Sequence, residues 1–528
     1  MLRRGYNYRV LDINALPNCA ASLKSLVIEQ HRQIEHLKLQ LARLRRWRFG
    51  QSSERLEGIE QLTLLLEELE ASLAKAEALM PSSTEAAPPE TPPPVRRKEF
   101  PEHFERNDNK IDPKECACPQ CGGPLSNLGK PDVAEVLEVK TITFTVTRHI
   151  RPKKRCGKCS IIVQAPAPSR PIERSYAGAS FLALVLCWKY AFALPLYRQC
   201  RIFETAGLII SRTTLMEWVG ASSELLGPLV AALGKYVLSA PNINADDTPV
   251  KVLNPGAGKT KKGHLWSYVR DGRPWGSTDP PATWYRYSPS WHGRYPQKHL
   301  AGYVGKLQAD AYAGYEPLYV PSAGTALARV LEIGCAAHCR RKFFDVYEAT
   351  HSAIAEEALD RIRALYNLEE QIRFRSAPER QALRQAHAVP LLSAMHAWMV
   401  KTHASIDQKS ELAKAFNYAF NHWAALLRYT EDGHLEIDNN AAERSLRGVG
   451  VGRRNFLFFG SDSGGDRAAI IYSLIETCRM NQIDPQRYLK YVLERIADHP
   501  INRIEELLPW NVRDQLQQPA PIARALAA

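Results

Sequence analysis

Three acidic residues that lie far apart along the chain, Asp246, Asp310 and Glu443, are of a type that could hold divalent cations together. Carboxylates brought close to one another repel unless protons or cations intervene, and carboxylate oxygen is a ligand that suits Mg²⁺ and Mn²⁺. Two such ions held about 3.5–4 Å apart can activate an attacking oxygen and stabilise a leaving one in an in-line displacement at phosphorus. The sequence therefore predicts metal-dependent phosphoryl transfer if the fold brings the three side chains together.

The elements that would position these residues begin after Pro241. The segments "NINADDTPVKVL", "GHLWSYVRDG" and "TWYRYSPSWH" are strand-like, and a short helical stretch and "GKLQADAYAGY" follow them. Three hairpin-linked strands, a helix and a fourth strand describe the opening of a ribonuclease-H-like α/β fold, in which the first and fourth strands are neighbours. This fold would place Asp246 beside Asp310. Glu443 joins them if "DNNAAERSLR" begins a helix packed against the strands, with Arg444 and Arg447 turned toward a phosphate backbone.

A long helical insertion separates Asp310 from Glu443. We expect a catalytic domain over residues 241–465, with the amphipathic insertion at about 345–430 and a C-terminal helical segment at 466–515. The insertion could clamp DNA or serve only as a packing subdomain. His338, Arg340 and Arg341 precede it, and a cation near the metal site could neutralise charge that develops at phosphorus. For His338 the alternative is a satisfied, buried histidine.

Two Cys-x-x-Cys pairs have the spacing of a zinc site: Cys118, Cys121, Cys156 and Cys159. A strand-like run separates the pairs, and four thiolates that converge in this way bind Zn²⁺ tetrahedrally, as in a zinc ribbon. We predict structural Zn²⁺ in a module over residues 112–165, with Cys116 as a possible substitute for Cys118. The alternative is a redox dithiol, which normally has one such motif. Basic residues flank the second pair, so this module could also contact DNA.

The N-terminal part has the periodicity of coiled-coil helices. Apolar residues recur in steps of three and four over residues 20–80, with a break near Gly50. The two helices could form a hairpin within one chain or a dimerisation zipper. The proline-rich stretch 81–99 that follows is expected to be an extended linker.

Residues 175–240 are also expected to form a helical domain. Within it a turn at Gly207 suits a helix-turn-helix, whose second helix opens at Ser211 or at the capping box from Thr214 to Glu217. Plain helix packing is the alternative interpretation of this pattern.

Composition sets the class of the protein and of its partners. The chain has 528 residues, more than one hydrophobic core usually serves, so several folded units are expected. A formal net charge of +13 favours a polyanionic partner, with nucleic acid first. No signal-peptide pattern is present, and the longest apolar run, Phe181–Trp188, is far shorter than the roughly 20 residues that cross a bilayer. We therefore expect a cytoplasmic protein with no membrane partner.

One apparent nucleotide-binding motif departs from the pattern that phosphate-binding loops require. The segment "GAGKT" at 256–260 resembles a phosphate-binding loop, but Leu253 stands where that loop requires its first glycine. The segment also joins two strands rather than a strand and a helix. We interpret it as a basic hairpin tip and expect no use of ATP.

Several blocks, taken in order along the chain, resemble one family: "ADDTPVKVL", "LQADAYAGY", "AAHCRRKF", "IDNNAAERSLR" and "VGRRNFLFFGSDSGG". They are similar to the signature blocks of transposases of the insertion sequence 66 family, which belong to the DDE class. The likeness also covers the N-terminal zipper, the zinc knuckles and the tail "NQIDPQRYL", and spans residues 20–500. It implies that Asp246, Asp310 and Glu443 are catalytic ligands of Mg²⁺. Asp247 stands where the family usually has Glu, and it is the alternative to Asp246 as the first metal ligand.

The resemblance implies a bacterial DNA transposase that is associated with the nucleoid when it is bound to DNA. It would bind the terminal inverted repeats of its element, cleave a strand with two Mg²⁺ or Mn²⁺ ions per site, and direct the freed 3′-hydroxyl at double-stranded target DNA. We expect a homo-oligomer formed through the N-terminal helices, with accessory proteins of the same element as further partners. Basic residues of the family blocks are the expected DNA contacts: His338, Arg340, Arg341, Arg444, Arg447, Arg453 and Arg454.

Two other classes of function stay open at this point. One is a catalytically inactive, zinc-containing DNA-binding repressor, against which the presence of all three carboxylates argues. The other is a metal-dependent nuclease without strand transfer, which a test for joined products separates from a transposase.

Overall fold

The computed structural model describes residues 19–49, 105–113, 117–140, 143–321 and 327–517. Contacts divide the chain into two compact units: one combines the N-terminal helix α1 with residues 333–438, and the other holds the remaining described residues. The second predicted coiled-coil helix, the linker at 81–99 and Cys116 lie outside the described residues. In the part of the chain that is described, no helix combines the length and the apolar character needed to cross a membrane.

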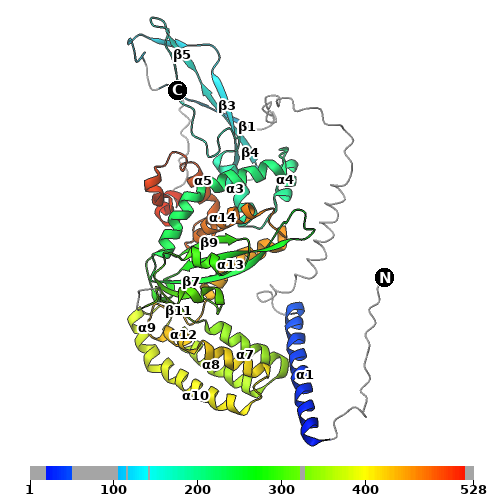
Figure 1. Cartoon of the computed structure of the whole chain (residues 1–528). Helices are drawn as coiled ribbons and strands as arrows, with labels where there is room; N and C mark the ends of the chain where they lie inside the picture. The colour runs from blue at the N-terminus through cyan, green and yellow to red at the C-terminus, as the bar shows by residue number, and fades with distance from the viewer. Residues whose placement is uncertain (1–18, 50–104, 114–116, 141–142, 322–326, 518–528) are drawn as a thin grey trace, which may run out of the picture. The chain divides into compact units, whose positions relative to one another are not determined.

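A mixed sheet, here called the central sheet, forms the core of the second unit (Figure 1). Its strand order is β11-β10-β7-β8-β9. Antiparallel pairs join β7 to β8 and β8 to β9, whereas β10 runs parallel to β7. The bounds are β7 (Asn242–Val252), β8 (Lys261–Arg270), β9 (Ala282–Ser288), α6 (Arg294–His299), β10 (Gly305–Gln308) and β11 (Val330–Ile333), with the short helices η3 (Arg273–Trp275) and η4 (Ala313–Leu318). The strands and α6 follow one another in the order that the sequence predicts.

Helices pack against the central sheet. Seven consecutive residues of β8, Gly263 to Val269, are buried, as in a sheet that is covered on both faces. α13 (Asn440–Phe456) contacts β7 and β8, while α14 (Asp462–Met480) and α5 (Arg212–Leu238) contact β9. The backbone N–H of Tyr285 on β9 donates to Ser473 Oγ of α14 over 2.8 Å, so polar contacts as well as apolar ones fix this layer. The chain then continues as α15 (Pro485–Leu493), η7 (Ile501–Leu507), η8 (Pro509–Val512) and α16 (Arg513–Gln517).

The region before the sheet is helical, as expected, with α3 (Ala179–Tyr190) and α4 (Leu196–Thr205) preceding α5. Gly207 adopts a left-handed φ of 82° in the turn between α4 and α5, which favours glycine there. The Ser211 side chain accepts the Thr214 backbone N–H over 3.0 Å. α5 therefore opens at Ser211, and the alternative start at the Thr214 capping box is wrong.

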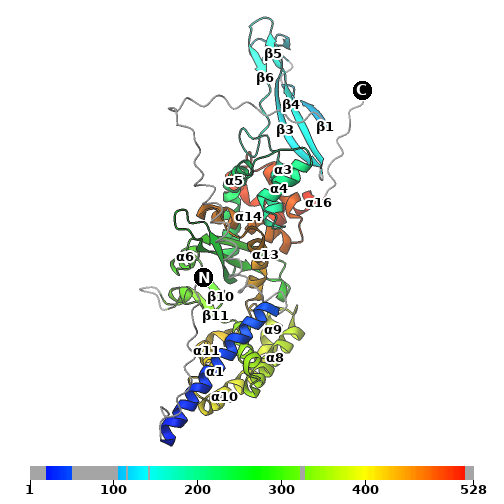
Figure 2. The same ribbon diagram turned by 90° about the vertical axis from the view of Figure 1, so that its right-hand side faces the viewer.

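Two small sheets make up the module that carries the cysteines (Figure 2). Their strand orders are β1-β4-β3 and β2-β5-β6. The Phe144 ring of β4 packs on Phe181 and Phe203 of the helical region, with centroids 5.6 and 5.7 Å apart, so an aromatic cluster joins the module to the helices. The bounds are β1 (Glu105–Lys110), β2 (Leu125–Asn127), β3 (Asp132–Lys140), β4 (Thr143–Arg151), β5 (Lys153–Cys156) and β6 (Ile162–Gln164).

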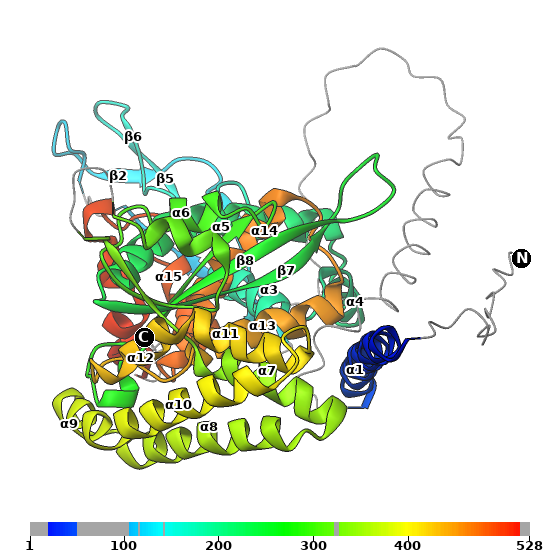
Figure 3. The same cartoon turned by 60° about the horizontal axis from the view of Figure 1, so that its bottom comes forward.

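The other unit is helical, and the expected insertion forms most of it (Figure 3). Its helices are α7 (Ala336–Thr350), α8 (Ala353–Ile372), α9 (Ala377–Leu383), the π-helical turn η5 (Arg384–Ala388), α10 (Val389–Ser405), α11 (Glu411–Asn421), α12 (Trp423–Leu427) and η6 (Arg428–Thr430). Phe343, Phe416 and Met399 fill its core. Arg384 is fully buried and donates to both carboxylate oxygens of Glu369, over 2.8 and 2.6 Å. This paired charge satisfies the guanidinium inside the unit.

The helix α1 (Ala20–Phe49) packs against this helical unit. Arg32 donates to Asp407 Oδ1 over 2.6 Å, and His36 lies 2.9 Å from Glu411. Leu39 is buried in the same contact. By contrast, zipper positions of the same helix are exposed: Val27, Ile34 and Leu37.

Candidate functional site

Asp246 lies on β7, and Asp310 lies just after the neighbouring strand β10. In the parallel pair of β10 with β7, Gln308 is the partner of Asn244. Asp310 follows Gln308 by two residues and Asp246 follows Asn244 by two, and side chains two residues apart leave a strand on the same face. The two carboxylates therefore meet at one end of the central sheet.

Asn439 fastens the helix of Glu443 to the same place. Its side chain is fully buried, donates to the Ala245 carbonyl over 2.7 Å and accepts from the Asn244 amide over 3.0 Å. Glu443 lies one helical turn further along, with its backbone N–H bonded to the Asn439 carbonyl. A bond of 2.6 Å between the Ser445 and Ser267 hydroxyls holds the next part of α13 on β8. The helix thus begins directly beside Asp246.

The electrostatics of Asp246 reflect this crowding. Burial raises its pKa well above the usual range, and the negative charges of Asp310, Asp247 and Glu443 raise it further, while the Asp247 backbone N–H opposes the shift. A carboxylate surrounded in this way favours a proton or a cation. Three acidic side chains offer only oxygen ligands, which suit Mg²⁺ or Mn²⁺. The structure thus places Asp246 near enough to Asp310 and Glu443 for their charges to act on it.

Asp247, the alternative to Asp246 as first metal ligand, has a different environment. Its Oδ2 lies 2.6 Å from His264 Nδ1, and its Oδ1 accepts the Trp291 indole N–H over 3.0 Å. Both oxygens are therefore engaged by side chains of the protein. Sequence reasoning missed His264, Trp291 and Asn439, because nothing in their local spacing marks them; only the sheet register brings them to the carboxylates.

The predicted DNA contacts divide into three groups. Arg444, Arg447 and Arg454 are exposed on α13. Arg453 is half-buried and donates to the Pro249 carbonyl of β7, so it also has a structural partner. The remaining ones belong to α7 in the helical unit, and their expected place beside the carboxylates stays a prediction: His338, Arg340 and Arg341.

The hairpin tip between β7 and β8 contains the "GAGKT" segment, as expected from its position between strands. Lys261, at the end of this hairpin, lies 2.6 Å from Asp462 at the start of α14. Its ammonium group is therefore balanced within the protein.

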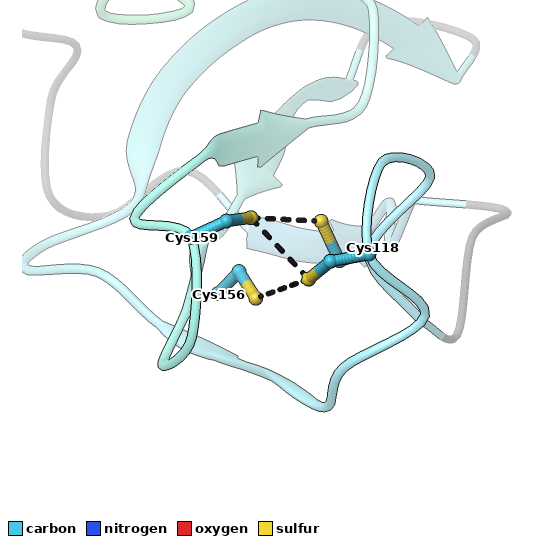
Figure 4. Close-up of side chains that lie close together, drawn as sticks. Cys118, Cys156 and Cys159 are labelled. Carbon is cyan, nitrogen blue, oxygen red and sulfur yellow. Dashed lines mark hydrogen bonds between the residues drawn. The ribbon is translucent and has the colours of Figure 1, made fainter.

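The four cysteines of the two pairs gather in one cluster (Figure 4). All four sulfur atoms lie within 4.8 Å of one another. Cys159 Sγ is 3.3 Å from Cys118 Sγ and 3.4 Å from Cys121 Sγ, which in turn is 3.4 Å from Cys156 Sγ. Tetrahedral zinc with Zn–S bonds of about 2.3 Å needs sulfur atoms only slightly further apart. The cluster therefore supports structural Zn²⁺ and the ligand set predicted from the sequence.

Matching backbone turns present the two pairs. The residue after the second cysteine of each pair is left-handed, with φ of 67° at Gly122 and 58° at Ser160. In the second pair a serine, and not Gly157, takes this conformation. Backbone N–H groups of Cys159 and Lys158 lower the pKa of the Cys156 thiol to about 6, which favours the thiolate that binds metal.

Comparison with known proteins assigns the chain to a family. A family model described as "Transposase IS66 family" matches residues 174–467, which is more than half of the sequence. The chain belongs to this family. Further models match the rest of the IS66 transposase: "zinc-finger binding domain of transposase IS66" at 115–160, "IS66 C-terminal element" at 473–510 and "Transposase C of IS166 homeodomain" at 36–108. The resemblance seen in the sequence is confirmed, and with it a role as a transposase.

Relatives of this IS66 transposase occur in Sinorhizobium fredii. The uncharacterized protein y4hP is 40% identical over 495 residues, which cover 90% of this chain and 88% of the relative. The uncharacterized protein y4qI is 35% identical over 498 residues, covering 93% of this chain and 92% of the relative. The printed names of these relatives state no activity.

Proposed function

We propose that this IS66 transposase cleaves double-stranded DNA at the ends of its element and joins the freed 3′ ends to target DNA. Both reactions are in-line phosphoryl transfers that depend on Mg²⁺ or Mn²⁺. The observation that carries the proposal is the convergence of Asp246, Asp310 and Glu443 from β7, the segment after β10 and α13. Their convergence supplies the ligands that such chemistry needs.

We further assign the central sheet to the ribonuclease-H-like class. The support is its strand order, β11-β10-β7-β8-β9, with three antiparallel strands followed by a strand parallel to the first. The class also accounts for the helical residues 333–438, which fold as a unit of their own between the sheet and the Glu443 helix.

The residues of the chain have distinct tasks in this mechanism. Asp246, Asp310 and Glu443 would hold two ions, and the bound ions supply Lewis-acid stabilisation of the attacking and leaving oxygens. Asn439 keeps the Glu443 helix against β7, so the carboxylates are positioned before DNA arrives. Arg444 and Arg447 present exposed guanidinium groups on the same helix, where they would bind backbone phosphates. Metal binding by Glu443 and phosphate binding by Arg444 and Arg447 would account for an acidic residue that directly precedes basic ones on α13.

Other parts of the chain would bind DNA and bring two ends together. The zinc module and the exposed arginines of the α4–α5 region, Arg198, Arg201 and Arg212, are the proposed contacts outside the site. The exposed zipper positions of α1 support the prediction of a homo-oligomer formed by this helix.

The test uses purified full-length protein, Mg²⁺, and duplex DNA carrying the inverted repeats that flank this reading frame. Wild type should cleave the end and form joined products with a target plasmid. Glu443→Gln should lose cleavage by at least about 10³-fold while still binding the DNA, because only the metal ligand set is damaged. Glu224→Gln, which changes an exposed carboxylate of α5 in the same unit, is the matched control and should keep wild-type activity.

Each result has a definite meaning. Equal cleavage by wild type and Glu443→Gln refutes the assignment of the site. Binding to the ends without cleavage under Mg²⁺ or Mn²⁺ favours an inactive repressor, and cleavage without joined products favours a nuclease.

A further inference from the structure

An exposed aromatic stack lies beside the acidic residues of β7. Trp291 is 51% exposed, although two rings stack against it. Its ring centroid lies 4.4 Å from that of Tyr312 with the planes 18° apart, and 5.7 Å from that of His264 with the planes 12° apart. The longer spacing to His264 corresponds to an offset arrangement. A substantial part of the indole surface therefore stays open to solvent.

Hydrogen bonds hold this ring in one orientation. The Trp291 indole N–H donates to Asp247 Oδ1, and the Tyr312 hydroxyl donates to the Trp291 carbonyl oxygen. Asp247 is itself held by His264. Ordering a large exposed side chain costs conformational entropy, so a surface tryptophan restrained from several directions is suited to contact a ligand without further loss.

The stack adjoins the proposed metal site through the chain itself. Asp247 is the residue after Asp246, and Tyr312 follows Asp310 by two residues. Burial raises the pKa of Tyr312, and the negative charges of Asp247 and Asp310 raise it further. A DNA strand with a phosphate at the carboxylates would therefore pass the stack close to the bond that is cleaved.

The chemistry of this surface selects one part of a nucleotide. Without bound cations, the carboxylates beside the stack repel phosphate. His264 Nδ1, both Asp247 carboxylate oxygens and the Trp291 indole N–H are used within the protein. The exposed part of the Trp291 indole is an uncharged aromatic surface, which suits a planar, uncharged group. A nucleobase presents such a face once it has left the duplex, and stacking of this kind tolerates any base.

We propose that Trp291, backed by Tyr312, stacks on an unpaired base of a nucleotide next to the cleaved bond. The stack holds the DNA end open and fixes the scissile phosphate against the carboxylates. This inference rests on the proposed function, since it takes end cleavage as the reaction.

The test removes each partner of the stack in turn. End duplexes carry an abasic nucleotide at one of the positions on either side of the cleaved bond, and cleavage rates are measured for wild type, Trp291→Ala and Trp291→Phe. At one position the abasic change should slow wild type by roughly 5- to 150-fold, the effect of one base–aromatic stack. Trp291→Ala should lose a similar factor on intact DNA and little more on the abasic DNA. Trp291→Phe keeps an aromatic face and should stay within about threefold of wild type.

A binding measurement separates this idea from the proposed function. Glu443→Gln protein is titrated with end DNA that carries 2-aminopurine at the position found by the abasic scan, or at each position in turn if no cleavage occurs. Stacking on Trp291 should quench the unpaired fluorophore, and the quench should disappear in the Glu443→Gln, Trp291→Ala double variant. Cleavage that is independent of Trp291 at every position overturns the stack and leaves the proposed function standing. Trp291-dependent quenching in a protein that never cleaves supports the stack and overturns the proposed function.

Discussion

Substitution of Asn439 by alanine should uncouple the Glu443 helix from β7. Asn439 is the residue before α13, yet its side chain makes no capping bond to the helix. It bonds instead to the Ala245 carbonyl over 2.7 Å and to the Asn244 amide over 3.0 Å. The cost of Asn439→Ala is therefore a loss of tertiary contacts and not of a helix cap.

The magnitude follows from these contacts. Each lost bond contributes about 1 kcal/mol, and a buried group left without a partner adds about 1–3 kcal/mol. The Ala245 carbonyl loses its side-chain partner, whereas Asn244 keeps a weaker bond to Gln308 at 3.3 Å. We expect a loss of ~2–4 kcal/mol in the free energy of unfolding of this unit. A shift of Glu443 by about 1 Å would also slow end cleavage by roughly 10- to 100-fold.

The assay compares Asn439→Ala with Asn455→Ala in urea unfolding, followed by circular dichroism, and in Mg²⁺-dependent cleavage of end DNA. Asn455 lies near the other end of the same helix and makes one exposed bond, to the Val451 carbonyl over 3.1 Å. Its loss should cost only about 0.5 kcal/mol and leave cleavage unchanged. The reasoning is refuted if Asn439→Ala cleaves at the wild-type rate and is no less stable than Asn455→Ala.

Three further predictions concern zinc, pH and the helical unit. Purified protein should contain about one Zn²⁺ per chain, and Cys156→Ser should lose it, as a colorimetric zinc assay would show; a full complement in the variant would contradict the ligand set. Because the pKa of Asp246 is raised, wild type without added Mg²⁺ or Mn²⁺ should lose stability relative to Asp246→Asn as the pH rises above about 4. In thermal melts the difference in melting temperature between the two proteins should widen with pH, and Mg²⁺ should reverse it. A difference that is independent of pH would argue against charge crowding. Arg384→Ala should destabilise the helical unit by ~3–5 kcal/mol because it removes the nearer cation from buried Glu369 and leaves only the longer contact to Arg380 at 3.6 Å. Arg363→Ala, which breaks an exposed pair with Asp360, should cost under about 1 kcal/mol, and equal losses in urea unfolding would count against this account.

The local spacing of residues was enough to predict those features whose functional groups lie within a few residues of one another. The two Cys-x-x-Cys pairs define a zinc ligand set because each pair is presented by one tight turn, and the observed cluster has those four residues. The succession of strands along the chain could be predicted as well, since turn residues and alternating patterns mark each hairpin. Even here some details needed the structure: Ser160 takes the left-handed turn of the second pair, and Ser211 opens α5.

The sequence by itself determined the donor types of this protein: thiolates for zinc, carboxylates at three separated positions, and arginines on the helix of one of them. Only the tertiary structure decided which carboxylates lie near one another and which residues support them. The register between β7 and β10 pairs Asn244 with Gln308 and so brings Asp310 near Asp246. The contacts of Asn439 and those among His264, Asp247 and Trp291 depend on residues from separate elements. Such contacts arise from packing between segments that are distant in the sequence, so local sequence patterns do not predict them.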